Sequence, residues 1–250
     1  MSKLIYADIP RVLRSKITLG SILITIFMAA ASVLTAVLDA ESKGLVFRIS
    51  TNNLTLFIAM LMPIFSGGVS ILIISTEFSS GIIRNKLIMG HSRRSILFAW
   101  TIIYSLLTLV TYIISVSAFF ITLKLNGCTI PEGNTGTIIT NLILIFCFVL
   151  KFQAFSLLML CIYPDAKLAV ICYMLNNMTM LLLVFASFSQ NSKKIVKALS
   201  RIFIYAYTSS DDFSFLTKPD TPWLTALCTL SLAAVYMFLA ERYFAKKDLK

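Results

Sequence analysis

Charged residues are scarce in this sequence. Only 13% of its 250 residues are charged and 58% are hydrophobic, whereas a soluble domain has roughly 25% charged residues. Six stretches of 18 to 28 residues hold no charge except Lys151: 17–38, 54–74, 96–123, 138–162, 168–189 and 223–240. Because the charged residues other than Lys151 are confined to the segments between these stretches, an ordinary soluble domain is excluded.

Each of the six stretches is long enough to cross a bilayer as a helix. A helix rises about 1.5 Å per residue, so roughly 20 residues cross a hydrocarbon core about 30 Å thick. Helices also satisfy their own backbone hydrogen bonds in lipid, and the stretches lack the alternation of a membrane β-barrel. We therefore predict an all-α polytopic membrane protein, in which 1–250 is a single transmembrane domain with six spans.

The side chains needed for several membrane chemistries are missing. His91 is the sole histidine and the five cysteines form no C-x-x-C pair, so we expect no metal site and no zinc protease. The stretches contain no Asp or Glu, which argues against aspartyl proteolysis and carboxylate-coupled ion transport. No Walker motif for ATP phosphates occurs. We expect a chain that is not an enzyme and binds no cofactor, so any nucleotide that drives it must bind another chain.

The Lys and Arg residues between the stretches predict the orientation. With the N-terminus inside, the inside segments hold 13 of these cations and the outside segments hold 8, five of them in 190–222. Cytoplasmic loops carry the excess of positive charge, so we place both termini in the cytoplasm. Anionic lipid attracts cations beside the spans by about 1 kcal/mol each. The net charge of +11 therefore predicts membrane lipid as a partner, and not nucleic acid.

Two segments outside the spans have the pattern of amphipathic helices. Segment 193–205 carries apolar residues on one face and cations on the other, so it is a surface helix on lipid headgroups or an outer gate. The N-terminal segment 4–16 predicts an interfacial helix. Its apolar face consists of Ile5, Ile9, Val12 and Leu13.

The connector 75–95 is patterned as a short amphipathic helix beneath the membrane. We expect Gly90 to end this helix in a left-handed cap, before Ser92 begins the next helix. The apolar residues, on two neighbouring faces, are Phe78, Ile82, Ile83 and Leu87. This apolar side lies on the bilayer or docks into a groove on a partner protein.

The same connector resembles the first cytoplasmic loop of type-2 ABC transporter permeases. The order E-x3-G-x2-R-N-x-L-x5-R-R is formed by Glu77, Gly81, Arg84, Asn85, Leu87, Arg93 and Arg94. Members of that family have six spans, an amphipathic helix before the first, a coupling helix in this loop and re-entrant helices before the last span. The counterparts here are 4–16, 77–90 and 193–221, and the tail FAKKDLK is similar to the family's usual ending.

The resemblance implies the permease subunit of an ATP-driven transporter of the bacterial cell membrane, similar to export or immunity permeases for drugs and peptide antibiotics. Its partners would be ABC ATPase subunits that hold ATP and Mg²⁺, and a second permease subunit, identical or homologous. Alternating access would export or clear a hydrophobic or amphipathic substrate, such as an antimicrobial peptide. The alternative is a non-transporting scaffold or regulatory subunit that recruits a soluble partner through its basic cytoplasmic loops.

The resemblance also places the ATPase-coupling interface in this connector. The expected residues are Glu77, Phe78, Gly81, Ile82, Arg84, Asn85, Lys86, Leu87, Arg93 and Arg94. Glu77 alone has a second interpretation, in which its carboxylate pairs with Arg84 or Lys86.

Polar residues inside the stretches are the candidates for a substrate pathway or a dimer interface. A charge at the depth of Lys151 costs about 3 kcal/mol on insertion scales, so we expect it inside the bundle, facing a partner helix or an aqueous cavity. Residues 63–68 predict a kinked helix with a small-residue surface, suited to close helix packing or to the pathway. The full set is Pro63, Ser66, Gly67, Lys151, Gln153, Asn176, Asn177 and Thr179.

Overall fold

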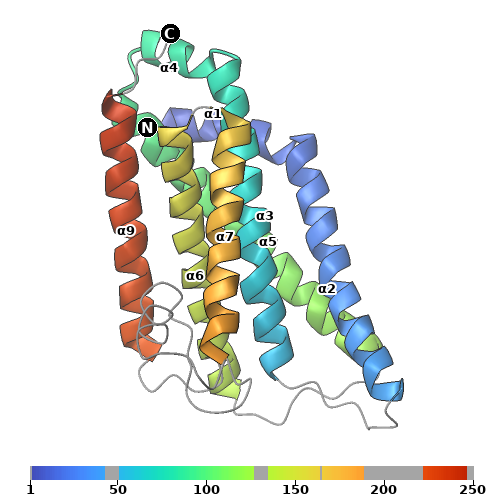
Figure 1. Cartoon of the computed structure of the whole chain (residues 1–250). Helices are drawn as coiled ribbons and strands as arrows, with labels where there is room; N and C mark the ends of the chain where they lie inside the picture. The colour runs from blue at the N-terminus through green and yellow to red at the C-terminus, as the bar shows by residue number, and fades with distance from the viewer. Residues whose placement is uncertain (1, 43–50, 127–134, 164, 189–221, 247–250) are drawn as a thin grey trace.

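The computed structural model describes residues 2–42, 51–126, 135–163, 165–188 and 222–246, which contain eight helices and no strand (Figure 1). The helices are α1 (Ser2–Leu13), α2 (Lys16–Ser42), α3 (Thr51–Ser79), α4 (Ile82–Ile88), α5 (Arg93–Leu125), α6 (Thr135–Ile162), α7 (Ala166–Phe188) and α9 (Pro222–Lys246). The predicted segments 193–205 and 193–221 lie outside the described residues.

Five of these helices contain segments long and apolar enough to cross a membrane. The segments are Lys16–Thr35, Met62–Ser79, Arg93–Leu125, Leu142–Ile162 and Ala226–Lys246, with mean hydropathies from 1.3 to 2.3. They fit the expected class, an all-helical multi-pass membrane protein. The fifth predicted stretch, 168–189, coincides with α7, a helix of 23 residues that is not among these five.

The helices at the connector 75–95 begin and end differently from the prediction. α3 continues through Glu77 and Phe78 to Ser79, and the separate helix α4 begins only at Ile82, so a single helix over 77–90 is wrong. Gly81, at φ +70°, lies between the two helices and separates them. Hydropathy marks where the apolar run ends, but the helix continues through the polar residues after position 74, whose hydroxyls donate to carbonyls of the preceding turn. Ser75 Oγ donates to the carbonyl of Leu72, for example (2.8 Å).

The helix α6 occupies the middle of the bundle. It packs mainly against α3 and α9, and also against α5 and α7, while α2 packs against α5 (Figure 1). Its segment Leu142–Ile162 is the most buried of the five candidate spans. Polar side chains of α6 therefore lie within the bundle, where they need partners from neighbouring helices.

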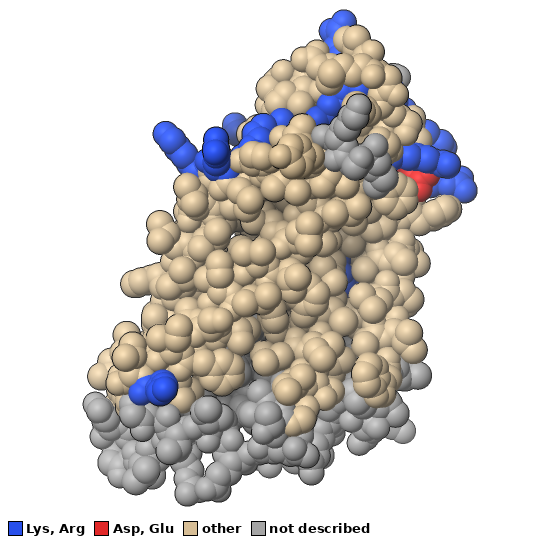
Figure 2. All heavy atoms as spheres, turned by 180° about the vertical axis from the view of Figure 1, so that it is seen from behind, with Lys and Arg blue, Asp and Glu red and all other residues tan. Residues whose placement is uncertain are grey.

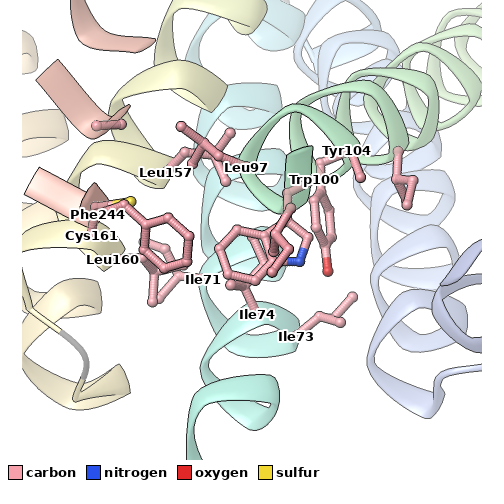
Figure 3. Close-up of a cluster of buried hydrophobic side chains, with 14 of the residues drawn as sticks. Ile71, Ile73, Ile74, Leu97, Trp100, Tyr104, Leu157, Leu160, Cys161 and Phe244 are labelled. Atoms are coloured by element: carbon pink, nitrogen blue, oxygen red, sulfur yellow. The ribbon is translucent and has the colours of Figure 1, made fainter. Parts of the chain in front are cut away.

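The core consists of two clusters of apolar side chains. The larger one surrounds Ile71, Trp100 and Tyr104 (Figure 3) and includes Leu4 and Val12 of α1 and Ile83 of α4. The smaller one contains Ala29, Val33, Met62, Tyr112, Phe119, Leu123, Ile145 and Val149. Both short helices are thus anchored in the core of the bundle by apolar side chains. For α4 this replaces both predicted placements of its apolar face, because Ile83 is covered by the chain itself.

One end of the bundle is strongly basic. The helices α1 and α4, the start of α5 and the end of α9 lie there, and we call it the α4 end (Figure 1). Figure 2 shows Lys and Arg side chains gathered at this end, above a flank with few charged side chains. The described cations on its helix ends and loops are Arg11, Arg14, Lys16, Arg84, Lys86, Arg93, Arg94, Lys167, Arg242 and Lys246.

Candidate functional site

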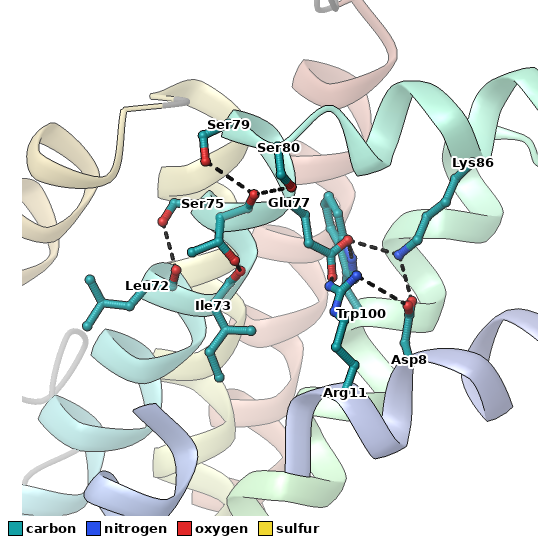
Figure 4. Close-up of polar contacts among 11 residues, drawn as sticks. Asp8, Arg11, Leu72, Ile73, Ser75, Glu77, Ser79, Ser80, Lys86 and Trp100 are labelled. Atoms are coloured by element: carbon teal, nitrogen blue, oxygen red, sulfur yellow. Dashed lines mark hydrogen bonds and ion pairs between the residues drawn. The ribbon is translucent and has the colours of Figure 1, made fainter. Parts of the chain in front are cut away.

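Four charged side chains meet beneath α4, three of them buried and one exposed (Figure 4). Asp8 and Arg11 come from α1, Glu77 from the end of α3 and Lys86 from α4. The side chains of Asp8, Glu77 and Lys86 are at most 7% exposed, and Arg11 is 38% exposed. We call these four residues the charge quartet.

The acids and bases of the charge quartet alternate around a closed ring. Lys86 Nζ lies 2.6 Å from Asp8 Oδ2 and 2.9 Å from Glu77 Oε2. Arg11 Nη2 donates to Glu77 Oε1, and Arg11 Nη1 lies 3.9 Å from Asp8 Oδ1. Two positive and two negative groups leave the ring without net charge, which makes the burial of three of these ions tolerable.

A tryptophan is the third hydrogen-bond donor to the carboxylate of Glu77. Trp100 Nε1 of α5 donates to Glu77 Oε2 (3.1 Å), so this carboxylate accepts from three donors. The indole also packs against Phe78 and Phe244, with ring centroids 5.8 Å and 5.5 Å away, a range in which aromatic pairs attract. The charge quartet is therefore closed on one side by aromatic rings.

Glycines in the left-handed region lie on both sides of α4. Gly81 has φ +70° and Gly90 has φ +85°, a backbone conformation that costs other residues energy. The predicted cap at Gly90 is confirmed, and so is the helix start at Ser92, whose Oγ accepts from Ser95 N (3.2 Å). The two glycines let the chain reverse sharply on either side of a helix of only seven residues.

One edge of α4 is exposed. The side chains of Arg84 and Asn85 are exposed, and the neighbouring Ile88 and Met89 are 74% and 68% exposed. We call Arg84, Asn85, Ile88 and Met89 the α4 edge. It combines a cation, an amide and two large apolar side chains at the basic end of the molecule.

The two arginines at the end of the motif bind α9. Arg93 Nη1 donates to the carbonyls of Phe244 (3.1 Å) and Ala245 (2.8 Å). Carbonyls in the last turn of a helix lack partners within the helix, and a cation there also complements the helix dipole. Arg94 pairs with Glu241 at 2.5 Å on the surface. Both arginines therefore fix the end of α9 to the start of α5.

The predicted coupling residues divide by exposure. Arg84, Asn85 and Arg94 are exposed, Phe78, Gly81, Ile82, Leu87 and Arg93 are half-buried, and Glu77 and Lys86 are buried in the charge quartet. Of the two sequence-based partners for Glu77, Lys86 is the one observed.

Sequence reasoning missed Asp8, Arg11 and Trp100. One signal for Asp8 was present: it lies between Leu4 and Val12 at four-residue spacing, on the apolar side of the N-terminal helix. A carboxylate on that side of an amphipathic helix indicates a buried partner, because an isolated buried charge is costly.

Lys151 lies inside the bundle, as predicted, and is 3% exposed. Its ammonium is 4.4 Å from the ring centroid of Phe148 and 4.9 Å from that of Phe152, within the range of cation–π attraction. Two other polar side chains of the predicted set, Gln153 and Asn177, bond to neighbouring groups. The oxygen of Gln153 accepts from Thr108, and Asn177 Nδ2 donates to the carbonyl of Tyr173 (2.9 Å).

Gln153 joins three helices through hydrogen bonds. Thr108 Oγ1 of α5 donates to Gln153 Oε1 (3.2 Å), and Gln153 Nε2 donates to Ser70 Oγ of α3 (2.7 Å). Nearby, a small pocket between α2, α3 and α5 is lined by hydroxyls and apolar groups. Its residues are Ser21, Thr25, Met62, Phe65, Ser66, Val69, Leu107, Thr108 and Thr111.

We expect Gln153→Leu to lower stability only modestly, because hydrogen bonds between membrane helices average about 0.6 kcal/mol and reach about 1.7 kcal/mol. Thermal unfolding of the purified protein in detergent measures this loss. Ser156→Ala is the matched control, since Ser156 Oγ donates within its own helix, to the carbonyl of Gln153 (2.7 Å). A loss for Gln153→Leu far above that range would show that the bridge does more than join helices.

Gly67 is the point of close approach between α3 and α7. Tyr173 of α7 donates its hydroxyl to the carbonyl of Pro63, beside Gly67. A Cβ at Gly67 would overlap the hydroxyl and ring of Tyr173, with the ring atom Cε2 at 2.7 Å. The predicted small-residue surface therefore packs against a neighbouring helix of the same chain. Ser66 lines the pocket, Asn176 is half-buried, and the side chain of Thr179 lies outside the described residues.

No family model matches the chain, and no curated protein matches it either. Its function must therefore be inferred from the α4 end and from the polar groups inside the bundle.

Proposed function

We propose that this protein is the transmembrane permease subunit of an ATP-driven ABC transporter. In this proposal it crosses the bacterial cell membrane six times, with α7 as the fifth span and the α4 end in the cytoplasm. A separate ABC ATPase subunit, carrying ATP and Mg²⁺, binds the α4 end, and a second permease subunit, identical or homologous, completes the transporter. The substrate is hydrophobic or amphipathic, an antimicrobial peptide being one such molecule.

The α4 edge is the observation that carries this proposal. Two large apolar side chains, Ile88 and Met89, are exposed beside a cation at an end rich in charge, where water-facing residues are usually polar. Exposed apolar groups rimmed by polar ones mark sites of interaction with proteins or membranes. The charge quartet and the buried Ile83 hold this edge in a defined place, which favours docking of a partner over a passive loop.

The distribution of cations supports the orientation. In the described residues, the α4 end carries Lys and Arg from the ends of α1, α2, α4, α5, α7 and α9. At the opposite end the described cation is Lys124, at the end of α5. Positive charge concentrates on the cytoplasmic side of membrane proteins, so the α4 end would face the ATPase.

The composition of the predicted spans supports transport that is driven by ATP hydrolysis on another subunit. No Asp or Glu lies within the six predicted spans to couple ion flow to transport. In the described residues, the polar groups between the helices include hydroxyls, Gln153, Asn177 and Lys151. An alternating-access pathway would use the hydroxyl-lined pocket between α2, α3 and α5, whose walls come from three different helices.

We expect a neighbouring reading frame to encode a Walker-containing ABC ATPase, and we expect Arg84→Glu to abolish copurification of this protein with that ATPase. The charge reversal places a carboxylate on the α4 edge but leaves the charge quartet intact, so folding should not change. The measurement is affinity purification from membranes, followed by ATP hydrolysis in proteoliposomes.

Lys167→Glu is the matched control, because Lys167 is an exposed cation in the other connector at the α4 end. Arg93 is not a suitable position for testing the coupling site, because a substitution there would also release the end of α9. An Arg84→Glu protein that still copurifies with full ATPase activity would refute the proposed coupling site. A stable complex whose ATP hydrolysis responds to no hydrophobic or amphipathic compound would favour the scaffold alternative.

A further inference from the structure

We propose that the interfacial helix α1 is a working part of the partner-docking site: Asp8 and Arg11 position the α4 edge through the charge quartet. They are positioning residues that act through Lys86 and Glu77. This inference rests on the proposed function, and it adds a helix that neither the motif nor the exposed surface would assign to docking.

The first step is that α4 cannot fix its own orientation. A helix of seven residues is far below the length at which helices are stable alone in water. Its flanking residues, Gly81 and Gly90, are both in the left-handed region. Only contacts with the rest of the protein can therefore hold the α4 edge in place.

The second step is that those contacts are few and that α1 supplies one of them. Ile83 anchors one face of α4 in the core. Lys86 anchors it through two carboxylates, of which Asp8 of α1 is the nearer, at 2.6 Å, and Glu77 of α3 lies at 2.9 Å. Lys86 lies two residues from Arg84 and one from Asn85, so its two ionic contacts tether the part of α4 that carries the α4 edge.

The third step is that α1 is itself held firmly. Leu4 and Val12 are buried in the larger core cluster, and Arg11 binds Glu77. The carbonyl of Val12 accepts from Thr18 Oγ1 of α2 (2.7 Å), which ties the end of α1 to the next helix. Asp8 therefore projects from a fixed helix. It can hold α4 in place because α1 does not move together with α4.

A variant that removes one acid and one base keeps the quartet neutral. It therefore separates the effect of Asp8 on the position of α4 from its effect on the stability of the fold. Removing one member of the quartet leaves an uncompensated buried charge, whereas removing an acid and a base together restores neutrality. The double variant Asp8→Asn with Lys86→Met keeps the Arg11 to Glu77 pair but breaks both ionic contacts of α4. Stability should recover in this variant, and the position of α4 should not.

The test compares the wild type, the double variant and Arg14→Gln, in which an exposed cation just beyond α1 is removed. Spin labels at positions 6 and 85, both exposed, report the distance between α1 and α4 in the full-length protein without any partner. Thermal unfolding and titration with the neighbouring-frame ATPase complete the measurements.

For the double variant we expect a thermal midpoint near that of the wild type, a broadened label distance and affinity for the ATPase at least about tenfold weaker, equivalent to about 1.4 kcal/mol. Arg14→Gln should change none of the three. An unchanged label distance overturns the inference and leaves the proposed function intact. A broadened distance with unchanged affinity overturns it as well. Failure of the wild type to bind the ATPase removes the proposed function, and the docking role of α1 with it.

Discussion

Glu77→Gln should lower the free energy of unfolding by about 3 kcal/mol or more, the usual effect of removing one partner from a buried ion pair. Glu77 accepts from Arg11, Lys86 and Trp100, and it is 0% exposed. Without its charge, the two cations of the quartet face Asp8 alone. For a chain of this size the thermal midpoint should fall by roughly 6 °C or more, as measured by unfolding in detergent.

Glu241→Gln is the matched control for Glu77. Glu241 also pairs with an arginine at the α4 end, but Arg94 is 77% exposed. Surface ion pairs are typically worth about 0 to 1 kcal/mol, so this variant should unfold near the wild-type temperature. Equal losses in the two variants would contradict the assignment of Glu77 to a buried network.

Gly67→Ala should destabilise the contact between α3 and α7 by about 1–3 kcal/mol or more, the range found for overpacked sites. The added methyl group would overlap Tyr173, which is 0% exposed and held by the carbonyl of Pro63. The tyrosine has no free space to move into, so the two helices must separate or the hydrogen bond must break. Thermal unfolding in detergent measures the loss.

Gly68→Ala provides the matched control on the next residue. There the nearest atom to the new Cβ is Met174 Cε at 3.9 Å, an ordinary contact, so the variant should be neutral or slightly stabilised. Combining Gly67→Ala with Tyr173→Ala should cost less than the sum of the two single variants, because the clash is gone. Strict additivity would show that Tyr173 is not what Gly67 accommodates.

Features encoded within a few neighbouring residues could be predicted from the sequence. The uninterrupted apolar runs predicted most of the long helices, and Gly90 and Ser92 predicted the end of one helix and the start of the next. The length of an apolar run reflects the thickness of the hydrocarbon core, however, and it does not show where a helix begins or ends. The boundary at residue 74 therefore missed the last turn of α3, where Glu77 lies.

Contacts between distant residues could not be predicted. Lys86 and Asp8 are 78 residues apart, and Tyr173 and Pro63 are 110 apart. No periodicity connects such positions, because the contacts depend on how α1 and α7 pack against α3 and α4. The motif grouped buried residues such as Lys86 with exposed ones such as Arg84, which only the fold separates.

The aromatic contacts around Trp100 also set an order for the making of this subunit. Phe78 and Trp100 are synthesised early, but Phe244, which packs on both, belongs to the last described helix. The carbonyls that bind Arg93 come from the same turn of α9. A nascent chain that has inserted α1 to α7 already contains the charge quartet, but it lacks Phe244, the α9 side chain that packs on Phe78 and Trp100. Completion of the α4 end therefore waits for α9, the last of the described helices.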